Sequence, residues 1–131
     1  MRPLIKASAA AAIVLAAFAV AAAAPAPGEG RTCFLPRHVD SWAAQGADVV
    51  NLKVHQDYFR LELAEACPEI QEADRIQLRA KGGGSLVCVN EAAQSEITAY
   101  SKVTGPRRCL VKTMQRLTAA EVAGLSKREK P

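Results

Sequence analysis

Four cysteines constrain this chain more than any other feature of its sequence. They are Cys33, Cys67, Cys88 and Cys109, and no two of them stand close together. Cysteine-rich metal sites, redox sites and haem-attachment motifs use close pairs such as C-x-x-C, which this spacing excludes. We therefore expect two disulfides, which persist in oxidising compartments and support a small domain.

The N-terminus has the features of an export signal. Arg2 and Lys6 precede a run of apolar and small residues over positions 7–24. A charged start, an apolar middle and a small-residue end are typical of a secretory signal peptide. Cleavage after Ala23 is predicted, which makes residues 1–23 the signal peptide. The sequence thus predicts a periplasmic or secreted protein without a stable membrane anchor once the signal is removed.

The remaining chain has the length of one domain. Residues 24–32 are rich in proline and glycine, which predicts a disordered lead-in. We expect a single β-rich domain over residues 33–125 and a frayed, charged tail over residues 126–131. The signal peptide holds two basic residues, so its removal lowers the formal net charge from +4 to +2. A mildly basic, mixed surface argues against nucleic-acid binding.

Alternating apolar residues predict strands along most of the domain. Residues 49–54 and 58–63 alternate most clearly, which predicts a hairpin with its turn near residues 55–57. A second hairpin is predicted from a strand at 75–80, a glycine turn at 81–85 and a partner strand at 86–89. Residues 90–104 are ambiguous, although 97–103 alternate like a strand. Gly105-Pro106 breaks this segment, and a last strand is predicted at 109–114.

Two short helical segments complete the predicted fold. Pro68 fits the first position of a helical turn, and Thr118 with Glu121 forms a capping box that predicts a helix over residues 119–125. The fold class that follows is α+β and mainly antiparallel β. It is a small single-domain sheet or partly open barrel with one or two short helices, stapled by disulfides.

Four cysteines allow three disulfide pairings. Cys67 and Cys88 flank the second predicted hairpin, and Cys33 and Cys109 bracket the domain from its start to its last strand. The sequence therefore favours Cys67–Cys88 with Cys33–Cys109. Trp42 is expected in the core.

The two histidines are the candidates for catalysis. His38 and His55 each have an aspartate two residues away, Asp40 and Asp57. A hydrolase would also need a placed nucleophile, and the sequence has no G-x-S-x-G elbow. Solvated histidines are the favoured interpretation, so no catalytic residue, metal or cofactor is predicted.

The densest positive cluster lies near the last strand. It consists of Arg107, Arg108, Lys112 and Arg116, and alternation puts Arg108, Leu110 and Lys112 on one side of the strand. Such a cluster is suited to an anionic partner. The alternative is an edge strand kept soluble by its charges.

Several short motifs resemble one family. They are Tyr58-Phe59-Arg60-Leu61, Cys67-Pro68, Ala73-Asp74-Arg75-Ile76, Cys88-Val89-Asn90-Glu91 and Arg108-Cys109-Leu110-Val111. Over residues 33–121 the chain is similar to a small exported bacterial cysteine-containing family, a domain of unknown function. It departs from the family at Asn90-Glu91, where the family has Gly-Asp. The resemblance implies export and disulfides, and it assigns no site residue.

Three functions are compatible with these observations. The leading hypothesis is a non-enzymatic periplasmic domain that binds a protein or an envelope component, or contributes to envelope maintenance. A second is an inhibitor of an envelope hydrolase such as lysozyme or a protease. The third is a small hydrolase-like enzyme that uses His38 or His55.

Overall fold

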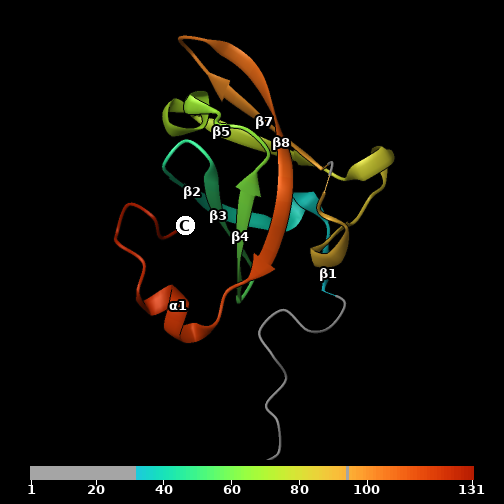
Figure 1. Ribbon diagram of the computed structural model, residues 1–131, viewed down its shortest axis with the longest axis vertical. Coiled ribbons are helices and arrows are strands. Elements are labelled where there is room, and N and C mark those ends of the chain that lie inside the picture. Colours follow the sequence, from blue (N-terminus) through green and yellow to red (C-terminus); the bar gives the residue numbers. More distant parts are fainter. Residues whose placement is uncertain (1–31, 94) are drawn as a thin grey trace, which may run out of the picture.

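The computed structural model describes residues 32–93 and 95–131 (Figure 1). The predicted signal peptide and all of the lead-in except Thr32 lie outside the described residues. The elements in chain order are β1 (Cys33–Phe34), η1 (Pro36–His38), β2 (Val39–Gln45), β3 (Val49–Val54), β4 (Asp57–Leu63), η2 (Pro68–Glu72), β5 (Arg75–Arg79), η3 (Lys81–Gly83), β6 (Val87–Cys88), η4 (Val89–Glu91), β7 (Glu96–Ser101), β8 (Gly105–Arg116) and α1 (Ala119–Ala123). The η elements are 3-10 helices.

A curled antiparallel sheet dominates the structure. Its six strands run in the order β2-β3-β4-β8-β7-β5, and a separate two-stranded sheet joins β1 to β6. Figure 1 shows the large sheet as a half-barrel in which β5 returns toward β2. The predicted fold class, a mainly antiparallel sheet or partly open barrel with one short α-helix and two disulfides, is confirmed. No helix in the described part of the chain has the length and apolar character needed to cross a membrane.

Strand β8 joins the two halves of this sheet. Its residues 105–110 pair with β7, and residues 111–116 pair with β4. The register with β4 shifts where Glu62 faces Thr113 while Leu63 faces Val111, which leaves Lys112 as an extra residue. A β-bulge of this kind bends a strand and increases its twist. The long curved path of β8 in Figure 1 follows from this bulge.

The hairpin of β3 and β4 is confirmed and supplies the centre of the core. Val50, Leu52, Phe59 and Leu61 are fully or almost fully buried on its inner face. The turn between the strands has two residues, and its first residue, His55, has a φ of 55°. A positive φ at the first turn position matches the right-handed twist of the flanking strands.

The predicted strand at 75–80 is confirmed as β5, but its predicted partner is wrong. β5 pairs with β7, whereas β6 pairs with β1. β6 has only two residues before η4 begins, so it is too short to match the five residues of β5. The last strand, β8, begins at Gly105 and not at the predicted Cys109. The break before it lies in the turn at residues 102–104, whereas the sequence predicted it at Gly105-Pro106.

The predicted disulfide pairing is wrong as well. All described cysteines are paired, but the bonds are Cys33–Cys88 and Cys67–Cys109, with Cα–Cα distances of 4.0 Å and 6.2 Å. The strand register explains the first bond, because Cys33 stands directly opposite Cys88 in the β1–β6 ladder. The second bond joins the start of η2 to the middle of β8.

The C-terminal segment folds back onto the sheet. The predicted capping box is present at Thr118 and Glu121, and α1 runs from Ala119 to Ala123. Beyond it, the tail predicted to fray instead makes a turn in which Lys130 N donates to Ser126 O over 3.0 Å. Figure 1 shows this end of the chain lying near β2 and β3.

Asn51 holds that tail in place. It lies on β3 between the core residues Val50 and Leu52, so its side chain points to the opposite face, yet it is 0% exposed. Its Nδ2 donates to the carbonyl of Glu129 (2.9 Å) and to Gln45 Oε1 (3.3 Å). Arg60 Nε donates to Asn51 Oδ1 (3.3 Å). A buried amide is thus satisfied by the tail and by two neighbouring strands.

The disulfide assignment can be checked by mass spectrometry of a tryptic digest under non-reducing conditions. The four cysteines fall in different tryptic peptides, so we expect the peptide with Cys33 linked to that with Cys88, and Cys67 linked to Cys109. The loops span 55 and 42 positions, for which chain entropy predicts about 4 kcal/mol of stabilisation each. Cys67→Ser and Cys109→Ser should therefore be destabilised alike. Any linkage between Cys67 and Cys88 would contradict the structure.

The tail contact predicts a second stability effect. Asn51→Ala removes the donor to the Glu129 carbonyl and leaves buried polar groups unpaired, so we expect the free energy of unfolding in urea to fall by about 1–3 kcal/mol. Deleting residues 126–131 should lower it too, and the two changes together should cost less than their sum. Gln56→Ala, in the exposed turn, is the matched control. Simple additivity would show that Asn51 and the tail are not coupled.

Candidate functional site

A groove lies between the two edge strands of the large sheet. It has a volume of about 910 Å³ and lies where the half-barrel fails to close. One wall comes from η1 and β2, the other from β5 and the glycine-rich segment after it. We call it the seam groove, and its lining residues are Leu35, Pro36, Arg37, Val39, Asp40, Ser41, Trp42, Ile76, Gln77, Leu78, Arg79, Ala80, Gly82, Gly83, Gly84, Ser85 and Glu96.

The floor of the seam groove is apolar because the core continues into it. Trp42 stands opposite Leu52 in the β2–β3 ladder, and Leu78 stands opposite Ile97 in the β5–β7 ladder, so both share the core face. Trp42 and Ile76 are half-buried and pack against the core cluster. Trp42 is thus only partly a core residue, contrary to the prediction, and its remaining surface lines the groove.

Local sequence shapes the rim on both sides. Pro36 starts η1, and His38 N closes its turn by donating to the carbonyl of Leu35 (2.8 Å). This turn lies against β5 and so closes part of the seam. On the other side, Gly82 and Gly83 both have a positive φ, near 70°, which only glycine adopts at no steric cost. The rim there carries no side chains beyond Cα.

Strand β5 is fastened to β7 on its outer face. The Arg75 guanidinium lies 4.1 Å from the centre of the Tyr100 ring, and the Tyr100 hydroxyl donates to Gln77 Oε1 over 3.0 Å. Such cross-strand contacts fix the register of β5 in an otherwise unsupported edge. One wall of the seam groove is therefore held in position even though no strand of the described residues pairs with the outer edge of β5.

The charges around the groove are of both signs. Arg79 on β5 is the cross-strand partner of Glu96 on β7, although the two form no ion pair within the described residues. The Asp40 carboxylate accepts the backbone N–H of His55 over 2.7 Å. Arg37, on η1, is exposed and makes no ion pair with any residue in 32–93 or 95–131. Arg37 and Arg79 are thus two basic groups of the groove without an ion pair in this part of the chain, and Arg79 alone stands opposite an acidic residue.

The two histidines lie side by side outside the groove. The ring centroids of His38 and His55 are 5.0 Å apart, but their aspartates are used elsewhere. Asp40 accepts the backbone N–H of His55, and Asp57 forms an ion pair with Arg116. Neither carboxylate orients an imidazole by a hydrogen bond in the described structure. Over the same residues, no group of three or more His, Cys, Asp or Glu side chains is placed to hold a metal ion.

The four basic residues predicted as one cluster do not form a single patch in the structure. Arg107 pairs with Glu69, with Nε and Oε1 3.7 Å apart, and Arg116 pairs with Asp57. Nine positions along a strand separate Arg107 from Arg116 by about 30 Å. Arg108 and Lys112 are exposed on β8 and flank Leu110, whose exposed fraction is 55%. The alternation prediction therefore holds for these three residues.

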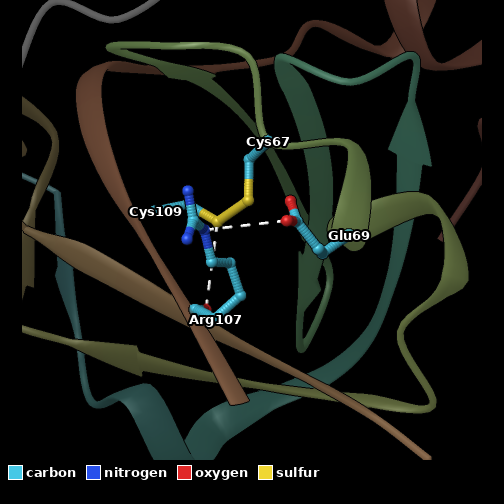
Figure 2. The surroundings of a disulfide bond; sticks show 4 residues. All are labelled: Cys67, Glu69, Arg107 and Cys109. Carbon is cyan, nitrogen blue, oxygen red and sulfur yellow. Dashed lines mark hydrogen bonds and ion pairs between the residues drawn. A yellow bond between two sulfur atoms is a disulfide. The ribbon is translucent and has the colours of Figure 1, made fainter. Parts of the chain in front are cut away.

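Figure 2 shows how Arg107 is engaged beside the second disulfide. Its guanidinium faces the carboxylate of Glu69 on η2, and Arg107 precedes Cys109 by two positions on β8. The Arg107 side chain is 64% exposed and that of Glu69 27%, so solvent weakens their attraction. The pair and the disulfide together tie η2 to the middle of β8. A small hollow of about 200 Å³ adjoins them.

Comparisons of the chain with protein-family models, with curated proteins and with solved structures found no match.

Sequence reasoning missed the seam groove because its walls come from distant segments. The strand β2 was not predicted, since Val39 to Gln45 alternates poorly and includes two adjacent alanines. Two features of the sequence do indicate one wall of the groove. Ile76 and Leu78 alternate on β5, and three successive glycines follow them at Gly82 to Gly84. Neither shows that β2 lies across from them.

Proposed function

We propose that this protein is an exported, non-enzymatic binding domain of the cell envelope, and that its partner binds in the seam groove. The observation that carries the proposal is the groove itself, about 910 Å³ between two strand edges that pair with nothing else in residues 32–93 and 95–131. Binding sites in proteins are concave, mostly apolar and supplied with a few placed polar groups. The groove is concave, and its lining combines the apolar side chains of Trp42, Ile76 and Leu78 with a comparable share of polar groups, among them the exposed Arg37.

Two disulfides support the envelope location. A domain of this size buries a modest core, and its staples form and persist in oxidising compartments. The predicted signal peptide agrees with this location. The two disulfides also restrict the internal freedom of the fold, which lowers the entropy cost of binding a partner.

Photo-crosslinking in cells that export the protein tests this proposal. A photoreactive phenylalanine analogue is placed at Ser85 or Arg79 on the groove rim, and at Ala123 on α1 as the matched exposed control. We expect a discrete crosslinked adduct from both rim positions and none from position 123. A rim variant with the additional change Arg37→Glu should give less adduct. Equal adducts at all three positions, or none at the rim, would contradict the proposal.

A further inference from the structure

The seam groove exposes main-chain groups as well as side chains. Its lining includes consecutive residues of both edge strands, 39–42 on β2 and 76–79 on β5. Successive side chains of a strand point to opposite faces, so a hollow that meets only one face touches alternate residues. Lining by consecutive residues means that the strand edges themselves, with their N–H and C=O groups, border the groove. In the described structure β2 pairs only with β3, and β5 only with β7.

The two edges differ in how well they can accept another strand. The β2–β3 ladder has a register irregularity between Val39 and Ser41, and bulges protect an edge against further pairing. The β5–β7 ladder is regular over all five residues from Arg75 to Arg79. A regular edge of five residues spans about 17 Å, and η1 lies against part of it. β5 is therefore the edge suited to strand addition.

An occupant that satisfies such an edge must present N–H and C=O groups at the spacing of a strand, which is a property of polypeptides. Building on the function proposed above, we infer that the partner is a protein and that it inserts an extended segment into the seam groove, where the segment pairs with β5. Main-chain hydrogen bonds then supply affinity, and pockets for alternate side chains supply specificity.

The side chains of the groove define what that segment carries. Trp42, Ile76 and Leu78 present an apolar floor, which favours apolar residues at alternate positions of the segment. Arg37 is exposed on the opposite wall and has no counter-ion among the described residues. Its charge is complementary to a carboxylate on the segment, either an acidic side chain or a C-terminus. The inferred ligand is thus an extended, apolar segment with one acidic group.

The experiment is a selection of random twelve-residue peptides, displayed on phage, against the disulfide-bonded protein. Enriched peptides are then synthesised, and their affinity is measured from the fluorescence of Trp42, the single tryptophan of the chain. We expect alternating apolar residues with one acidic residue. N-methylation of alternate peptide amides, in the register that faces β5, should weaken binding about tenfold or more, because it removes strand hydrogen bonds. Methylation in the other register is the matched control.

A protein variant tests the charge separately. Arg37→Glu should weaken binding of the acidic peptides about five- to tenfold, whereas Arg108→Glu on β8 should leave it unchanged. Both side chains are exposed, so neither change is expected to affect folding. Protection of the β5 amides from hydrogen exchange by the peptide, with those of α1 unaffected, should accompany binding.

Each other outcome overturns the inference in a distinct way. Peptides that tolerate N-methylation in both registers would show docking by side chains alone. A failure to enrich any peptide, with crosslinks still formed at the groove rim, would assign the groove to a non-peptide ligand and leave the proposed function intact. Native mass spectra dominated by a dimer that Arg37→Glu dissociates would make the occupant a second copy of this chain. Failure of the crosslinks themselves would count against the proposed function.

Discussion

The whole structure depends on β8 pairing with two different strands, β7 and β4. Its first half pairs with β7 and its second half with β4, and the bulge at Lys112 separates the two ladders. A strand that bends at this point turns one half of the sheet toward the other. The bond between Cys67 and Cys109 fastens η2 to the strand close to the bend. The curl of the half-barrel is therefore set by one strand and held by one covalent bond.

The open seam is the consequence of that curl. Bending at β8 brings β5 and β2 to face one another, and η1 lies against β5, but no ladder joins the two edges in the described structure. Unpaired edges expose polar main-chain groups and usually attract other chains, so proteins protect them. Here the irregularity in β2 protects one edge, whereas the five regular residues of β5 leave the other available. This asymmetry is the basis of the proposal that the groove binds an extended segment.

Local patterns were predictable from the sequence, and long-range pairing was not. The β3–β4 hairpin and the capping box at Thr118 are specified by neighbouring residues, so the sequence predicts them correctly. That all four cysteines form disulfides also follows from their spacing. Their pairing depends on β6 joining β1 rather than β5, which no local signal indicates. The same limit applies to the seam groove, since Trp42 and Leu78 line one groove only because the sheet curls.

Nuclear magnetic resonance of the uniformly labelled, disulfide-bonded protein tests the central claim most directly. Cross-strand nuclear Overhauser effects should connect β4 with β8 and β5 with β7, and should be absent between β2 and β5. The outward-facing amides of β5 should exchange with solvent faster than those that pair with β7. Regular cross-strand contacts between β2 and β5, with slow exchange along both edges, would show a closed barrel. That result would contradict the open seam and every inference drawn from it.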